Sequence, residues 1–169
     1  MKKKILRQYL EIKSLEDIKE TLKPEDHYLV ELVAPNDFQL NKFFYKQVGK
    51  KYYWTDWLDK TEKELNNFVN DKNVIFYTLI KDGWPAGFFM LDYRVNKICN
   101  LSFLGLVEET IGLGLGKYLL KTAILTAWDS NKIETLTVNT CSLDHKRALQ
   151  LYQKNGFSPV EFKDFEKHV

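Results

Sequence analysis

The order of apolar and polar positions along the chain predicts an alternation of strands and helices. Short runs in which apolar residues alternate or cluster indicate strands, and they lie at 5–13, 28–34, 74–81, 85–93, 96–107, 133–139 and from 157 onwards. Apolar residues at helical spacing indicate helices at 37–48, 61–69, 112–128 and about 144–154. This order of two strands, two helices, a three-stranded meander and then helix, strand, helix, strand predicts one mixed α/β domain over residues 1–169.

Local signals mark several boundaries between these elements. Thr61 followed by Glu64 forms the pattern of a capping box at a helix start. Asp82-Gly83 between two apolar runs favours a tight hairpin turn. Gly49 follows the helix predicted at 37–48 as a C-cap, and Asp144 stands where it can cap the helix predicted to begin there.

Composition and charge narrow the class of protein. The chain has 169 residues, of which 44% are hydrophobic and 28% charged, with a formal net charge of +2, so neither a nucleic acid nor a membrane is expected as its partner. No apolar run approaches the ~20 residues of a membrane span, and no secretory segment opens the sequence. Cys99 and Cys141 form neither a disulfide framework nor a metal motif. We expect a cytoplasmic protein without a metal, and a monomer or a homodimer.

The strongest functional signal is the sequence GLGLGK at residues 112–117, between an apolar strand and a predicted helix. Glycines at alternate positions let another molecule approach the backbone closely, and the free N–H groups at a helix N-terminus bind phosphate or pyrophosphate. The segment is neither a P-loop nor the GxGxxG fingerprint of dinucleotide-binding folds. On the glycines alone, tight packing of a helix against a sheet explains the pattern equally well.

The sequence further along gives GLGLGK a more specific meaning. Residues 144–157 read DHKRALQLYQKNGF, and together with the glycine turn and the DGWPAG hairpin at 82–87 they resemble the GNAT acetyltransferase superfamily. Further segments are similar to a bacterial branch of that family, namely 44–57, 102–116 and 140–145. The chain departs from the family motif at Ile111 and Leu113, where relatives often carry side chains that contact phosphate.

The resemblance implies a GNAT fold, in which a mixed, mostly antiparallel sheet splays around a central helix that binds acyl-CoA. It also implies acetyl-CoA as co-substrate, with its pantetheine arm between the strands at 98–107 and 133–139 and a backbone N–H polarising the thioester. The cofactor-binding residues that it implies are Leu106, Val107, Gly112, Leu113, Gly114, Leu115, Gly116, Lys117, Asn139 and His145. Because Ile111 and Leu113 are apolar, backbone N–H groups should carry nearly all of the phosphate binding, with Lys117 the only nearby cation in the motif.

Acetyl transfer to an amine by direct attack in a ternary complex requires two proton transfers. Tyr152, four residues after Ala148, occupies the family's general-acid position and would protonate the leaving thiolate. Glu109 is the expected general base for the ammonium, with Asp92 and His145 in reserve, and the alternative for Glu109 is that it only solvates the end of a strand. Cys141 is expected to be a packed side chain and not a nucleophile.

The acceptor is expected to be a primary amine of a small molecule, held beside aromatic side chains. An aromatic cluster at 45–57 lies in the segment that overhangs the acceptor groove in this family, and Tyr45 and Trp54 are the expected substrate-binding residues. Two other functions stay open: a GNAT-like module that binds acyl-CoA without catalysis, and a protein acetyltransferase acting on an N-terminus or a lysine. A closed aromatic pocket favours the small molecule, and an open groove favours the protein.

Overall fold

The computed structural model describes residues 1–15, 27–32, 38–54, 56–57, 59–130 and 133–168. The strands are β1 (Lys2–Ile12), β2 (His27–Leu32), β3 (Val74–Lys81), β4 (Trp84–Val95), β5 (Ile98–Leu106), β6 (Thr135–Cys141) and β7 (Ser158–His168). The helices are α1 (Phe38–Gly49), α2 (Glu62–Val69), α3 (Leu115–Ser130) and α4 (Ala148–Lys154), with short 3-10 turns η1 (Lys50–Tyr52) and η2 (Glu108–Thr110). Residues 33–34 of the second predicted strand and residue 37 of the first predicted helix lie outside the described residues.

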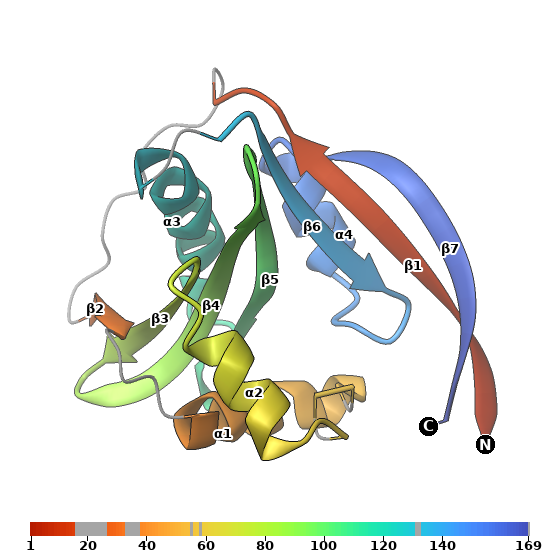
Figure 1. Cartoon of the computed structure of the whole chain (residues 1–169), viewed down its shortest axis with the longest axis horizontal. Helices are drawn as coiled ribbons and strands as arrows, with labels where there is room; N and C mark the ends of the chain where they lie inside the picture. Colours follow the sequence, from red (N-terminus) through yellow and green to blue (C-terminus); the bar gives the residue numbers. More distant parts are fainter. Residues whose placement is uncertain (16–26, 33–37, 55, 58, 131–132, 169) are drawn as a thin grey trace.

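The seven strands form one sheet in the order β2-β3-β4-β5-β6-β1-β7 (Figure 1). Among the described strands, neighbours are antiparallel except β5 and β6, which run parallel. The N-terminal strand β1 lies between β6 and β7, so Lys2 is paired with His168 and the two ends of the described chain are side by side. The expected mixed, mostly antiparallel sheet is confirmed.

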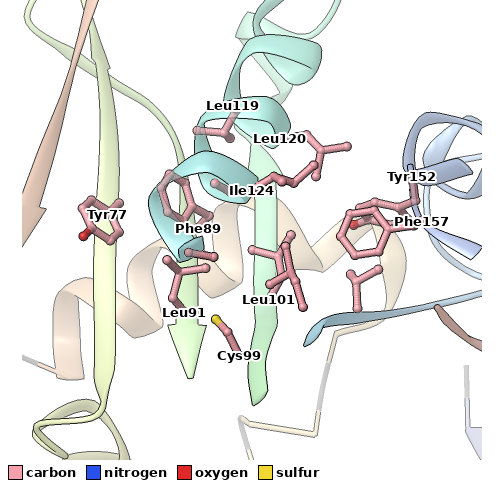
Figure 2. Close-up of a cluster of buried hydrophobic side chains, with 14 of the residues drawn as sticks. Tyr77, Phe89, Leu91, Cys99, Leu101, Leu119, Leu120, Ile124, Tyr152 and Phe157 are labelled. Atoms are coloured by element: carbon pink, nitrogen blue, oxygen red, sulfur yellow. The ribbon is translucent and has the colours of Figure 1, made fainter. Parts of the chain in front are cut away.

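Helices cover both faces of this sheet, and β4 divides its side chains between the two sides. Phe88 and Met90 pack in a cluster with Phe44 and Val48 of α1. The alternate residues Phe89 and Leu91 join a larger cluster, which includes side chains of α3, α4 and β6 (Figure 2). Because successive side chains of a strand point to opposite faces, α1 and α3 lie on opposite sides of the sheet. The larger cluster fixes α3 and α4 against the strands that form the site.

Two helices begin later than the sequence predicts. The central helix α3 begins at Leu115 and not at residue 112, because Gly112 and Gly114 have φ of +94° and +78°. A right-handed helix needs negative φ, so residues 111–114 form a turn that leads into the helix. Residues with a side chain rarely tolerate these positive values, which explains the glycines. Helix α4 begins at Ala148, and its N-cap is Arg147. Asp144 is therefore not the cap of this helix, and its carboxylate is free for contacts elsewhere.

Of the other three local signals, two are confirmed and one is wrong. Thr61 and Glu64 form both hydrogen bonds of a capping box at the start of α2, and Asp82 and Gly83 both have positive φ, as a type I′ hairpin turn requires. Gly49 is helical with φ of −81°, and the left-handed residue that turns the chain is Tyr53. A Cβ on Gly49 would lie 2.5 Å from Cβ of Trp54, so glycine is needed there for a close approach.

Candidate functional site

The parallel strands β5 and β6 separate after a short paired stretch. Their register ends at the pair Asn100–Thr137, while β5 runs on to Leu106 and β6 to Cys141. Beyond that pair lies a cleft of about 430 Å³, which is lined by both strands, the glycine turn, α4 and the segment after α1. The separation of these two strands therefore creates the cleft.

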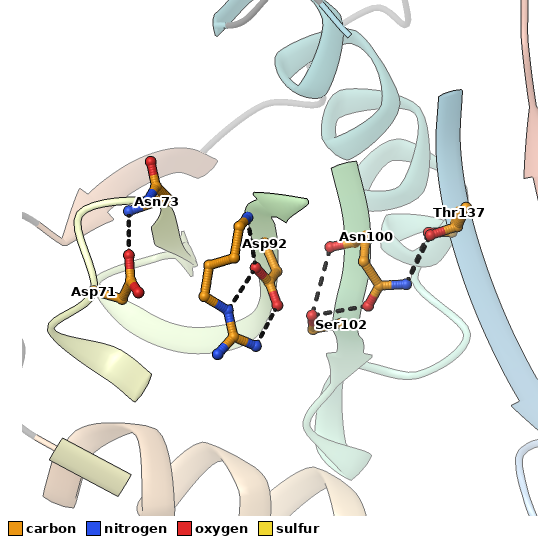
Figure 3. A network of polar contacts seen from close by, with 7 residues as sticks. Asp71, Asn73, Asp92, Asn100, Ser102 and Thr137 are labelled. Carbon is orange, nitrogen blue, oxygen red and sulfur yellow. Dashed lines mark hydrogen bonds and ion pairs between the residues drawn. The ribbon is translucent and has the colours of Figure 1, made fainter. Parts of the chain in front are cut away.

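Polar side chains join the two strands where their backbone pairing ends. Asn100 Nδ2 donates to Thr137 Oγ1 (2.9 Å), and Ser102 Oγ donates to Asn100 Oδ1 (2.9 Å) (Figure 3). Ser102 has no partner in β4, because the register shifts between Met90 and Leu91. Such a bulge bends a strand, so β5 turns away from β6 at this point. The Asn100–Thr137 bond thus joins the two strands where the cleft begins, and Ser102 orients the Asn100 amide.

The wall formed by β5 presents backbone groups that no strand uses. Val107 N–H donates to the carbonyl of Ala86 (2.9 Å), and hydrogen-bonded positions alternate along an antiparallel pair. Gly105 therefore also turns its N–H and C=O to β4, whereas Leu104 and Leu106 turn theirs to the cleft, which both residues line. Of the two expected backbone donors, Leu106 faces the cleft. Val107 does not, because its N–H is already bonded and its side chain is buried.

The glycine turn forms one end of the cleft. The expected cofactor-binding residues that line the cleft are Leu106, Gly112, Gly114, Gly116, Lys117, Asn139 and His145. Two others of that set take no part through their side chains: Leu113 is exposed outside the cleft and Leu115 is buried in the core. The first N–H groups of α3 have no partner within the helix, as at any helix start.

A second cation joins Lys117 in the cleft, and the sequence motif did not include it. Arg147, just before α4, lines the cleft together with Lys117. Among the described residues no ion pair neutralises either side chain. The two charges come from segments thirty residues apart in sequence. The cleft is thus more favourable to a phosphate than the apolar Ile111 and Leu113 suggested.

Tyr152 on α4 lines the cleft and is otherwise buried. Its exposed fraction is 7%, and its ring packs edge-on against Phe157 with centroids 5.6 Å apart. Burial raises the pKa of the Tyr152 hydroxyl above its usual value, and the negative charge of Asp144 raises it further. The hydroxyl therefore keeps its proton at neutral pH and remains a hydrogen-bond donor.

The carboxylates expected as bases lie away from Tyr152. Glu109 is exposed in η2 and does not line the cleft. This turn is fixed by Thr110, whose hydroxyl lies 2.9 Å from the carbonyl oxygens of Ala86 and Val107. Asp92 is on β4, outside the cleft lining, where Arg94 holds both its oxygens (2.9 and 2.7 Å). A role for Glu109 as base thus requires a water relay, and Asp92 is engaged in an ion pair.

Two contacts across the cleft join the segment after α1 to the loop after β6. Trp54 Nε1 donates to Asp144 Oδ1 (3.0 Å), and the rings of Tyr52 and His145 meet edge to face with centroids 6.3 Å apart. All four residues line the cleft. His145 Nδ1 accepts from the N–H of Arg147 (3.2 Å), so the neutral ring carries its proton on Nε2 and acts as a donor.

The sequence did not indicate the hydrogen bond between Asp144 and Trp54, because the two residues lie 90 positions apart and no spacing signals their contact. Of the two expected substrate-binding aromatics, Trp54 lines the cleft. Tyr45 is 4% exposed in the core, and its hydroxyl accepts from the N–H of Trp57 (3.3 Å). Burial raises the pKa of Tyr45 to about 12. The structure therefore places Tyr45 behind the wall of the cleft and not in it.

Three other observations on the described part of the chain concern metal ligands, the two thiols and membrane-spanning helices. No three His, Cys, Asp or Glu side chains gather there as a metal site would need. Burial raises the pKa of both thiols, that of Cys99 to about 12, so neither is an activated nucleophile. No helix of the described residues is long and apolar enough to span a membrane.

Solved structures of acetyltransferases share this fold. A GCN5-related N-acetyltransferase from Kribbella flavida is 12% identical with a TM-score of 0.65, over 95% of this chain and 56% of that one. A tandem GNAT protein from the clavulanic acid biosynthesis pathway is 12% identical with a TM-score of 0.68, over 95% of this chain and 53% of that one. An aminoglycoside acetyltransferase from an uncultured soil metagenomic sample is 14% identical with a TM-score of 0.59, over 84% of this chain and 90% of that one.

The chain spans 50% to 63% of the length of the five solved structures that head this comparison. No curated protein sequence matches it. The model of the acetyltransferase (GNAT) family matches residues 34–157, which include the glycine turn, Tyr152 and Phe157. The chain therefore belongs to the acetyltransferase (GNAT) family.

Proposed function

We propose that the chain transfers the acetyl group of acetyl-CoA to the primary amine of a small molecule, by direct attack in a ternary complex. The cleft is the observation that supports this most. It offers backbone groups of β5 along one wall, the start of α3 at one end and Tyr152 in its side. An acyl-CoA has an extended arm with amide groups and a pyrophosphate, which match the first two features. Family membership supports acyl transfer as the reaction class.

In this proposal the pyrophosphate lies against the N–H groups of residues 112–117. Gly112 and Gly114 are required by the backbone, since both have positive φ. The backbone conformation does not require glycine at position 116, because Gly116 does not have a positive φ. A Cβ there would meet only Leu106 Cδ1, at 3.8 Å. Because glycine within a helix costs up to ~1 kcal/mol relative to alanine, its presence is best explained by a ligand that approaches closely. Lys117 and Arg147 offset the phosphate charge.

The pantetheine arm then runs along the open edge of β5. The N–H and C=O groups of Leu104 and Leu106 bind it as a further strand would, and the N–H of Leu106 polarises the thioester carbonyl. Asn139 on β6 and His145, with its Nε2 proton, contact the arm from the opposite wall. This arrangement brings the thioester to the end of the cleft near Tyr152.

The reaction requires the amine to lose its ammonium proton before it attacks. Water in the cleft carries that proton to Glu109, which is exposed beside the glycine turn. The nitrogen lone pair forms a bond to the thioester carbon, the C–S bond breaks, and the sulfur leaves as a thiolate that accepts a hydrogen bond and then a proton from Tyr152. The second proton that the nitrogen loses on becoming an amide restores the tyrosine hydroxyl, so the products are the acetamide and CoA thiol.

A small acceptor is favoured over a protein by the two contacts that cross the cleft. The Trp54–Asp144 hydrogen bond and the Tyr52–His145 ring contact narrow the space in which a peptide backbone would have to lie. The aminoglycoside acetyltransferase among the fold neighbours is, by its name, an enzyme of small amines, which is compatible with the same class here. Tyr52 and Trp54 provide apolar walls for the acceptor.

Release of CoA thiol from acetyl-CoA in the presence of a panel of small primary amines tests the proposed function. We expect thiol release matched by acetylated product with at least one amine, and binding of acetyl-CoA by calorimetry without any acceptor. Tight binding with no turnover on any amine or peptide would support a non-catalytic acyl-CoA module instead. Turnover on peptides alone would support a protein acetyltransferase.

Substitution of Gly116 by Ala separates cofactor binding from folding. Alanine favours the helix and finds room in the structure, so the urea midpoint should stay the same or rise. The added methyl group occupies the place proposed for the phosphates, so Kd for acetyl-CoA should rise at least about tenfold. Thr126→Ala, later in α3 and outside the cleft lining, is the control. Unchanged affinity in Gly116→Ala would place the cofactor elsewhere.

Tyr152→Phe tests the proposed acid. Phenylalanine keeps the ring that packs on Phe157, so stability should change little, whereas kcat should fall about 10²- to 10⁴-fold with Kd for acetyl-CoA nearly constant. Because burial raises the pKa of Tyr152, the hydroxyl loses its proton only above its usual value of ~10. The wild-type kcat should therefore show no falling limb from this group between pH 6 and pH 9. A near-wild-type rate in the variant would remove Tyr152 from the mechanism.

A further inference from the structure

Asp144 is the one carboxylate among the described residues that line the cleft. It lies in the loop between β6 and α4 and has no role in the acid–base scheme proposed above. The other acidic residues considered for this site lie elsewhere: Glu109 is exposed in η2, and Asp92 is bound by Arg94. A negative charge inside a small, largely apolar cleft is costly unless it is hydrogen-bonded or meets a cation.

Three hydrogen bonds fix the orientation of this carboxylate. Oδ2 accepts from Thr140 Oγ1 and from the N–H of Cys141, both at 2.8 Å. Oδ1 accepts from Trp54 Nε1 at 3.0 Å. A carboxylate has about four acceptor positions, so Oδ2 holds the loop while Oδ1 retains an acceptor position beside the indole.

The surroundings of Oδ1 suit an organic cation. The side chains of Tyr52, Trp54 and Phe103 line the same part of the cleft, and Val48 adds an apolar surface. The rings of Trp54 and Phe103 are themselves in contact, with centroids 5.8 Å apart. Aromatic faces together with one carboxylate form the usual setting for an ammonium group that carries an apolar body.

Asp144 precedes α4 and Tyr152 lies in it, and both residues line the cleft. The negative charge of Asp144 is one of the causes, after burial, that raise the pKa of Tyr152, and it likewise acts on Tyr52. A nitrogen held by Oδ1 would therefore stand in the same cleft as the group that assists the leaving sulfur.

We infer that Asp144 binds and positions the nitrogen of the acceptor, and that the acceptor is a small primary ammonium compound with an apolar body. This inference rests on the proposed function and names the substrate class of the same site. The carboxylate accepts an N–H from the ammonium and, after deprotonation, from the amine, which leaves the nitrogen lone pair free to attack the thioester. Asp144 is thus a positioning residue for the acceptor.

Asp144→Asn tests this with 2-phenylethylamine, an ammonium at pH 7, and aniline, which is neutral there. Loss of a charge-assisted hydrogen bond should raise KM for 2-phenylethylamine about 10- to 100-fold. KM for acetyl-CoA should stay within about twofold, and kcat/KM for aniline should change little. Thr140→Val is the matched control, since it removes one hydrogen bond from the same carboxylate, keeps its charge and lies outside the cleft lining. The Thr140→Val variant should retain the wild-type preference for 2-phenylethylamine over aniline.

Equal effects of Asp144→Asn and Thr140→Val on both amines would overturn the inference and leave Asp144 as a loop residue only. Should Asp144→Asn fail to fold, wild-type enzyme provides the second measurement. The tertiary amine N,N-dimethyl-2-phenylethylamine, an ammonium with one N–H at pH 7, should compete with 2-phenylethylamine at a concentration at least about tenfold lower than the neutral 4-phenyl-2-butanol, and equal inhibition by the two would overturn the inference. Wild-type protein that binds no acetyl-CoA, or releases no thiol with any amine, would instead refute the proposed function itself.

Discussion

Two parallel strands that stop pairing in the middle of a sheet leave backbone N–H and C=O groups without strand partners on both sides of a gap. Such groups need a partner when they are shielded from water, and here neither strand is able to shift to provide one. β5 is held by β4 along its other edge as far as Leu106, and β6 is held by β1 as far as Cys141. The gap is therefore a feature of the fold itself, and its backbone groups are available to a ligand with amide groups of its own.

The position of β1 makes the gap between β5 and β6 possible. β1 lies between β6 and β7 and pairs with both, so β6 has one open edge, which faces β5. The β1 side chains Ile5, Leu10 and Ile12 are at most 3% exposed. Burial of each contributes roughly 1.5–3 kcal/mol to the stability of the fold. The N-terminal strand thus stabilises one wall of the cleft, although it contributes no residue to the lining.

Much of the fold followed from local chemistry, whereas the contacts of Trp54 and Asp144 in the cleft did not. The capping box at Thr61, the Asp82-Gly83 turn and the grouping of the glycine turn with Tyr152 depend on nearby residues or on a family motif. The place of β1 and the Trp54–Asp144 bond depend on contacts more than 80 residues apart in sequence. Tyr45 has the same aromatic character as Trp54, so only packing shows that one is core and the other lines the cleft.

Amide hydrogen exchange with and without saturating acetyl-CoA tests whether the cofactor binds along the open edge of β5, because it reports on individual backbone N–H groups. The N–H groups of Leu104 and Leu106 face the cleft and should become protected when the pantetheine arm binds. The N–H of Val107 serves as an internal reference, since it already donates to Ala86 and should change little. Saturation of the protein by acetyl-CoA without added protection at Leu104 and Leu106 would contradict the account.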